Sequence, residues 1–141
     1  MTTNVQSKQS NHVRLGFWPT ALVAGIAAAL VNLLVYFVVT SVFGYSLEIA
    51  TPGGPAMPLT PLPIIITSFI PAIGAAVLLA LLNRFVRRPF PIFLVVAVIF
   101  FLLSLGGPLS LPIAATNKAI LILMHTLAAL VIVGSLRRFS R

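Results

Sequence analysis

Residues 17–43 read FWPTALVAGIAAALVNLLVYFVVTSVF, and no side chain in this run is charged. An α-helix needs about 20 residues to cross a hydrocarbon core about 30 Å thick, so the run is long enough to span a bilayer. Three more apolar runs follow, at about residues 62–82, 90–105 and 117–136. We therefore predict an all-α integral membrane protein, a bundle of four transmembrane helices.

The composition indicates the same solvent. Of the 141 residues, 60% are hydrophobic and 7% are charged, whereas about a quarter of the residues of a soluble domain are charged. The apolar residues form continuous runs, so the outward faces of the elements are apolar too. The third run is the shortest, and it ends at Gly106, Gly107 and Pro108. We divide the chain into a polar tail, residues 1–16, and a single membrane domain, residues 17–141.

The basic residues lie at the ends of the apolar runs, almost all on one side of the predicted membrane. Lys118 and the only acidic residue, Glu48, fall on the other side. Because cytoplasmic connections are enriched in lysine and arginine, we predict that both termini are cytoplasmic. The basic residues on the predicted cytoplasmic side are Lys8, Arg14, Arg84, Arg87, Arg88, Arg137, Arg138 and Arg141.

The net charge of +8 does not indicate a nucleic-acid partner. Proteins that bind nucleic acid gather their basic residues on a folded polar face, whereas here the basic residues flank membrane spans. We interpret Arg84, Arg87, Arg88 and the three C-terminal arginines as topology signals that contact anionic lipid headgroups. Membrane lipids are therefore the first predicted partners.

The predicted connections differ in length. The cytoplasmic turn at Arg84–Arg88 is short, whereas the outer connection over residues 44–61 is long and has a proline at every third position from Pro52 to Pro61. Polyproline II has about three residues per turn, so these prolines would line one edge of an extended segment. Gly53 and Gly54 argue against a stiff rod. We expect a solvated connector across the mouth of the bundle; a docking strip for another protein is the alternative.

Polar groups inside a bilayer are costly, so each requires a reason. Asn32 lies near the centre of the first run and His125 near the centre of the fourth, at similar depths. We predict a hydrogen bond between them within an intramembrane polar seam that also includes Thr67 and Ser104. One interpretation is a structural interhelical contact of about 1 kcal/mol. The other is a proton carrier, or a single-histidine pigment ligand at His125.

A second group of polar residues falls on the predicted outer surface. Glu48 and Lys118 are placed to form an ion pair, and Asn117 adjoins them. If a ligand binds outside the membrane, we expect it there. Because Glu48 is the only carboxylate side chain, a mechanism that uses two carboxylates is excluded. The sequence also has no cysteine, and we predict no metal site.

Four segments are similar to those of an uncharacterised family of small bacterial four-helix membrane proteins, catalogued as a domain of unknown function. They read AAALVNLLVYFV (27–38), LLNRFVRRPFPIF (81–93), LLSLGGPL (102–109) and KAILILMHTLAALVIVGSLRR (118–138). The resemblance covers nearly the whole chain after the tail. It implies a four-helix fold and a bacterial inner membrane, but no activity.

These observations favour a non-catalytic accessory or assembly subunit that packs against a larger membrane complex. The alternative is a small oligomeric transporter or channel, for which a hydrophobic substrate would require the fewest polar groups. A subunit that holds a pigment or cofactor through His125 is a third hypothesis. We predict that the protein is not an enzyme, because the sequence lacks a Ser/His/Asp set, a metal cluster and a phosphate-binding loop.

Overall fold

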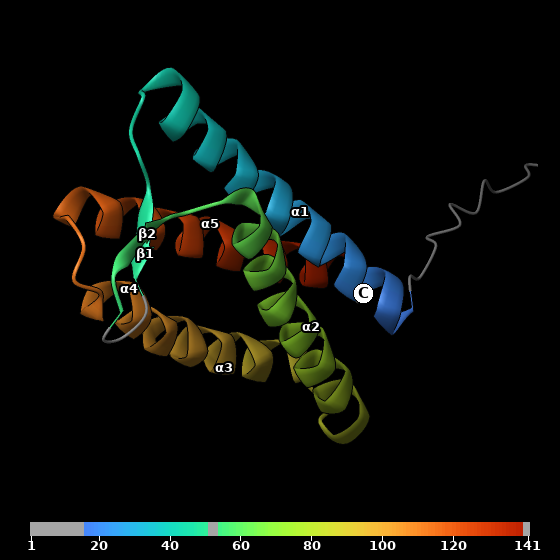
Figure 1. The fold of residues 1–141 in the computed structure, drawn as a ribbon. Helices are drawn as coiled ribbons and strands as arrows, with labels where there is room; N and C mark the ends of the chain where they lie inside the picture. Colours follow the sequence, from blue (N-terminus) through green and yellow to red (C-terminus); the bar gives the residue numbers. More distant parts are fainter. Residues whose placement is uncertain (1–15, 51–53, 140–141) are drawn as a thin grey trace, which may run out of the picture.

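The computed structural model describes residues 16–50 and 54–139, in which a helical bundle carries one small hairpin (Figure 1). Most of the predicted tail, residues 1–15, and Arg141 lie outside the described residues. The elements are α1 (Phe17–Phe37), the π-helical turn η1 (Val38–Val42), β1 (Glu48–Ala50), β2 (Ala56–Pro58), α2 (Pro61–Phe85), α3 (Pro89–Ser104), α4 (Gly106–Ser110) and α5 (Ala115–Phe139).

Within residues 16–50 and 54–139, four helical segments are long and apolar enough to cross a membrane: Trp18–Val42, Pro61–Phe85, Pro89–Ser110 and Ala115–Arg138. The prediction of a membrane-spanning helical bundle is confirmed, and the chain is a multi-pass membrane protein. The third span is longer than predicted. α3 ends at Ser104, but Gly106 and Gly107 begin α4, and the Leu109 amide donates to the Leu105 carbonyl at 3.1 Å.

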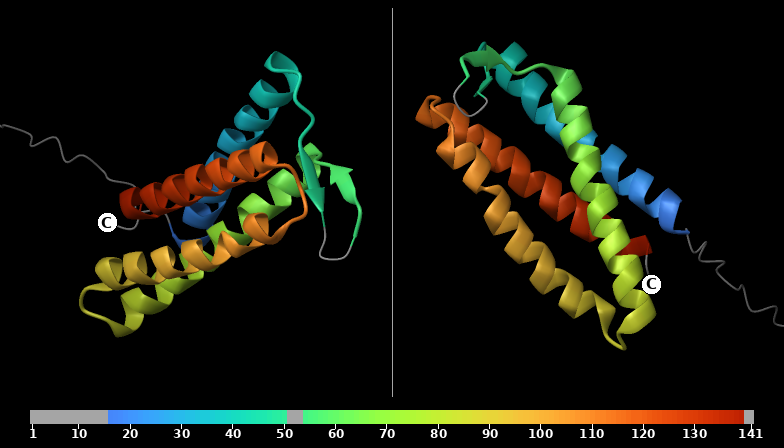
Figure 2. Two further views of the ribbon diagram at one scale, coloured as in Figure 1. Left: turned by 90° about the vertical axis from the view of Figure 1, so that its left-hand side faces the viewer. Right: turned by 60° about the horizontal axis from the view of Figure 1, so that its bottom comes forward.

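The start of α1, the α2–α3 turn and the end of α5 lie at the same end of the bundle (Figure 2). We call this the arginine end, because Arg84, Arg87, Arg88, Arg137 and Arg138 lie there. The strands and the α4–α5 connection lie at the opposite end, the hairpin end. Among the helices, α1 packs most extensively against α2 and next against α5, whereas α3 makes fewer contacts, to α2 and α5.

Small residues allow α1 to approach its neighbours closely. Ala21, Ala24 and Ala28 on α1 are buried against a core that includes Ala72 and Ala76 of α2. At Gly25 the approach is closest, since a Cβ atom there would lie 2.6 Å from the ring of Phe69. Interfaces between helices in membranes are rich in such residues because lipid supplies little hydrophobic driving force, so close packing must hold the helices together.

The proline-rich connection, which we expected to be a solvated connector across the mouth of the bundle, contains a short hairpin that the sequence did not indicate. β1 and β2 are antiparallel, with Ile49 opposite Met57. The Leu59 amide extends this pairing with a 2.8 Å hydrogen bond to the Leu47 carbonyl. Both leucines are buried in a cluster with Leu121 of α5. Burial of these two leucines provides a reason for the strands to pair despite the prolines. Pro52 and Gly53 lie outside the described residues.

Candidate functional site

Asn32 is buried between α1 and α2, and its partner is a residue that the sequence did not single out for the seam. The Asn32 Nδ2 atom donates to the Ser68 Oγ atom at 3.2 Å, and the Ser68 hydroxyl donates to the Ile64 carbonyl at 2.8 Å. Asn32 is 7% exposed and Ser68 is 1% exposed. Asn32 Oδ1 has no hydrogen-bond partner among residues 16–50 and 54–139. Spacing could have revealed Ser68, since Ile64, Ser68, Ala72 and Ala76 recur every four residues on the buried face of α2.

The predicted hydrogen bond between Asn32 and His125 is not formed. His125 is exposed, and its Nδ1 atom lies 2.9 Å from the Leu121 carbonyl oxygen in the preceding turn of α5. The buried face of α5 passes through Leu121, Met124 and Ala128. His125 lies about 100° around the helix from Met124 and only about 40° from Leu121, so it is beside the buried face, but its side chain is exposed. The residues on either side of His125 in the sequence are mostly apolar, so the sequence alone does not show that its side chain is exposed.

The hydrogen bond to Leu121 determines which His125 nitrogen is available to a partner. A carbonyl oxygen only accepts, so Nδ1 must carry the hydrogen, and in the neutral ring Nε2 is then an acceptor. No hydrogen bond from the described residues reaches Nε2. His125 therefore presents an unpaired acceptor on the flank of a membrane-spanning helix.

The other two predicted seam residues bond within their own helices. The Thr67 hydroxyl donates to the Pro63 carbonyl at 2.7 Å, and the Ser104 hydroxyl donates to the Phe101 carbonyl at 2.7 Å. Both residues are exposed. Among the four predicted seam residues, no hydrogen bond joins one to another within the described chain. Of the four, Asn32 is the one whose side-chain hydrogen bond reaches another helix, at Ser68 of α2.

The three residues of the predicted outer polar group, Glu48, Lys118 and Asn117, likewise have separate surroundings. Lys118 donates from Nζ to the Leu109 carbonyl at 3.1 Å, and no ion pair with Glu48 is formed between these two described residues. Glu48 lies in β1, half-buried, opposite Pro58. Asn117 is 2% exposed, and in the described part of the chain its Oδ1 atom has no hydrogen-bond partner. The lysine thus joins α5 to α4 instead of holding the hairpin.

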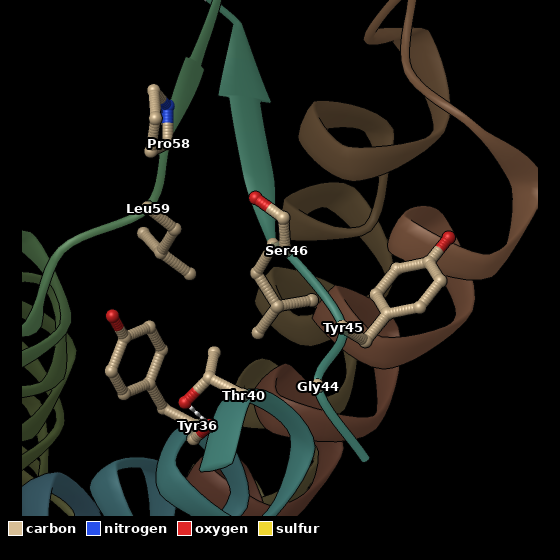
Figure 3. A pocket seen from close by; sticks show the side chains of 8 residues that line it. Tyr36, Thr40, Gly44, Tyr45, Ser46, Pro58 and Leu59 are labelled. Atoms are coloured by element: carbon tan, nitrogen blue, oxygen red, sulfur yellow. Dashed lines mark hydrogen bonds between the residues drawn. The ribbon is translucent and has the colours of Figure 1, made fainter.

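A hollow of about 300 Å³ lies beside these residues at the hairpin end, between η1 and the strands (Figure 3). Hydroxyl groups of Tyr36, Thr40 and Ser46 line it together with the apolar side chains of Leu47 and Leu59. The Thr40 hydroxyl is already engaged, since it donates to the Tyr36 carbonyl at 2.8 Å. The sequence did not indicate this hollow because its walls come from three segments brought together by the hairpin. The described residues that line it are uncharged.

A family model described as a family of unknown function, DUF6069, matches residues 13–141. The chain belongs to this family. Searches of curated proteins and of solved structures gave no match. The predicted resemblance to an uncharacterised family of four-helix membrane proteins is therefore confirmed. Among the described residues of this DUF6069 protein, no group of three or more His, Cys, Asp or Glu side chains is placed to hold a metal ion.

In this DUF6069 chain, α3 is the helix least enclosed by the others. Within α3, Phe93 is the buried side chain. Phe90, which precedes it by one turn, packs against it with ring centroids 5.8 Å apart. The rest of the helix exposes large apolar side chains, namely Ile92, Leu94, Val95, Val98, Ile99, Phe100, Leu102 and Leu103. Contact between α3 and the bundle is therefore concentrated near its first turns, at the arginine end.

Two arginines at this end of the DUF6069 chain lie over aromatic rings. The Arg137 guanidinium carbon is 5.7 Å from the centroid of the Phe90 ring, which joins the end of α5 to the start of α3. The Arg84 guanidinium carbon is 5.8 Å from the ring of its neighbour Phe85, which is 75% exposed. Contacts of this kind contribute about 0.5–1 kcal/mol at exposed sites.

Proposed function

We propose that this protein is a non-catalytic accessory subunit of a larger membrane assembly, and that it binds its partner through the side of the bundle formed by α3 and α5. The observation that supports this most strongly is His125, a polar side chain exposed on the flank of α5 about ten residues into the span. In lipid alone the Nε2 acceptor would have no donor, which is costly. A donor from a neighbouring transmembrane helix would satisfy it.

Helical spacing indicates the direction in which His125 points. Residues seven apart on a helix project in nearly the same direction. Lys118, seven residues before His125, donates to the Leu109 carbonyl of α4. Ile132, seven residues after it, is buried in the cluster that contains Phe93 of α3. His125 therefore faces the α3 side of α5, between two points of contact, and is still exposed.

Ser104 supports the same side. It follows Phe93 by eleven residues, or about three turns, so both project from the same side of α3. Phe93 is fully buried, whereas Ser104 is exposed. His125 and Ser104 thus project from the sides of α5 and α3 that also carry buried residues, yet both side chains are exposed. A partner helix that packed there would contact both residues as well as the apolar surface of α3.

Transport through the bundle receives less support. A small oligomeric transporter or channel would require a continuous polar path, and the predicted seam residues are not hydrogen-bonded to one another. Asn32 contacts Ser68 in the α1–α2 interface, whereas His125 is exposed on the side of α5 that faces α3. A non-catalytic role also agrees with the sequence, in which Glu48 is the only acidic side chain.

The geometry of His125 favours a second candidate, a planar metal-bearing pigment held through Nε2. Histidines that bind a metal almost always donate the other ring nitrogen to a carboxylate, a backbone carbonyl or water, and the Leu121 carbonyl occupies that position here. An absorption spectrum of the gently purified protein separates the candidates. A visible band that is lost in His125→Ala supports the pigment, and a colourless complex with a second protein supports the subunit.

We further propose that both termini are cytoplasmic and that the membrane is a bacterial inner membrane. The arginine end would then face the cytoplasm, in agreement with the enrichment of basic residues there. Because the chain has no cysteine, single cysteines report without background. We expect a membrane-impermeant maleimide to label Ser46→Cys in intact cells and to spare Arg88→Cys. The reverse labelling would contradict this orientation.

Site-specific photo-crosslinking in native membranes tests the proposed docking side. We would place a photoreactive residue at Ser104 of α3 and, as the matched control, at Leu30 of α1, which is 62% exposed. We expect a discrete protein adduct from Ser104 and none from Leu30. Adducts of equal yield from both positions, or lipid adducts alone, would overturn the proposed side.

A further inference from the structure

The arginine end carries a positive charge that the chain itself does not neutralise. Arg84, Arg87, Arg88, Arg137 and Arg138 are all exposed there. The single acidic side chain of the full sequence, Glu48, lies in β1 at the opposite end. An acidic side chain that neutralises these arginines must therefore come from outside the chain.

One of these arginines is held in position by the fold. Arg137 lies over the Phe90 ring, and Phe90 in turn packs against the fully buried Phe93. Phe90 follows Pro89, the first residue of α3, and the turn between α2 and α3 just before it contains Arg87 and Arg88. The contact between Arg137 and Phe90 therefore brings the end of α5 beside the two arginines of this turn. Three arginines from two separate segments therefore lie near one another in the fold where the spans end.

We propose that Arg87, Arg88 and Arg137 form a binding site for the phosphate of an anionic phospholipid headgroup. A guanidinium group has a planar set of donors that matches phosphate oxygens in pairs. The position at the ends of the spans matches the headgroup layer of a bilayer. Each arginine near an anionic membrane surface contributes about 1 kcal/mol, which corresponds to about five-fold in affinity.

The site has a structural consequence for α3. A headgroup bound between the α2–α3 turn and Arg137 joins the start of α3 to the end of α5. This is the same region in which Phe93 attaches α3 to the core. Bound anionic lipid therefore stabilises the helix that the protein encloses least. The inference does not depend on the proposed docking side, which lies farther along α3.

Arg84 provides a matched control. It lies on α2 at the same end, has the same charge and also contacts a ring, but that ring belongs to its own neighbour, Phe85. Loss of either Arg84 or Arg137 removes one positive charge from the arginine end. Only the loss of Arg137 removes a group that links α5 to α3.

The test measures lipid binding and thermal unfolding of the full chain in nanodiscs of phosphatidylcholine with increasing phosphatidylglycerol. We expect phosphatidylglycerol to raise the unfolding midpoint of the wild type. Arg137→Gln and the double variant R87Q/R88Q should lose most of this rise and bind phosphatidylglycerol about five-fold or more weakly, whereas Arg84→Gln should lose clearly less of the rise than either of them. Arg137→Lys, which keeps the charge but not the paired donors, should show a partial loss.

Several outcomes would overturn the proposed lipid site. Equal losses in Arg84→Gln and Arg137→Gln would show diffuse attraction without a defined site. An equal rise with inorganic phosphate in pure phosphatidylcholine would show that a free anion suffices. No rise with phosphatidylglycerol would leave an acidic protein as the source of counter-charge. If Arg137→Gln does not fold, R87Q/R88Q decides, because both residues lie in an exposed turn.

Discussion

α1 and α3 are both apolar enough to cross a membrane, but they pack in different ways. α1 is rich in alanine and buries Ala21, Ala24 and Ala28 against its neighbours. α3 consists mainly of large aliphatic and aromatic residues, and Phe93 is the side chain that it buries. Small residues let backbones approach, whereas large residues in lipid gain little from leaving it. Hydropathy thus predicts which segments span a membrane, and residue size predicts which of them form the core.

The largest expected effect concerns the attachment of α3. Phe93→Ala removes its buried ring and leaves a cavity, so we expect the free energy of unfolding to fall by about 3 kcal/mol. The matched control is Phe100→Ala on the same helix, whose side chain is 67% exposed, and we expect it to change stability by less than about 0.5 kcal/mol. Reversible unfolding in mixed micelles measures both. Equal effects would show that α3 is not attached through Phe93.

The next effect concerns the close approach of α1. In Gly25→Ala the new methyl group would meet the Phe69 ring, so we expect a loss of about 1–3 kcal/mol. Gly74→Ala on α2 is the control, since its Cβ position has no neighbour within 4 Å among the described residues. The same unfolding measurement applies. A neutral Gly25→Ala would mean that Phe69 moves aside and that α1 is not held as tightly as its alanine face indicates.

A smaller effect is expected at the polar contact of the core. Asn32→Ala and Ser68→Ala each remove the hydrogen bond between α1 and α2, and such bonds in membranes contribute about 0.6 kcal/mol on average. A double-mutant cycle isolates the pair, and we expect a coupling of that size. Thr67→Ala is the control because its hydroxyl bonds within α2. A coupling of zero would show that the hydrogen bond from Asn32 Nδ2 to Ser68 does not stabilise the protein. Any effect of Asn32→Ala would then come from Oδ1, which has no partner in the described chain.

Much of the fold could be predicted from the sequence, because hydropathy acts on each helix separately. The ends of the first span were predicted to within about a residue, and the third was extended by α4 because Gly106 and Gly107 tolerate a helical turn. The hairpin was missed because it depends on the burial of Leu47 and Leu59 beside α5, a contact between distant segments.

The candidate site was harder to predict for the same reason. Asn32 was correctly placed inside the bundle, but its partner depends on which helix lies beside α1. The sequence indicates a buried face on α2 without stating which helix covers it. His125 was placed inside because it lies between apolar residues, and it projects in nearly the same direction as the buried Ile132, but no neighbouring helix covers it in the described chain.

α3 is less enclosed than α1, and we propose that a partner protein covers α3 and the neighbouring His125 of α5. One measurement tests this proposal most directly. The protein would be isolated in a mild detergent from cells that express the wild type, His125→Leu or the control Leu130→Ala on another exposed face of α5, which is 66% exposed. We predict that a second membrane protein co-purifies with the wild type and the control and is reduced at least ten-fold with His125→Leu, while unfolding stability is unchanged. Recovery of the wild-type chain alone, or of the same partner in the same amount with His125→Leu, would contradict the proposed subunit role.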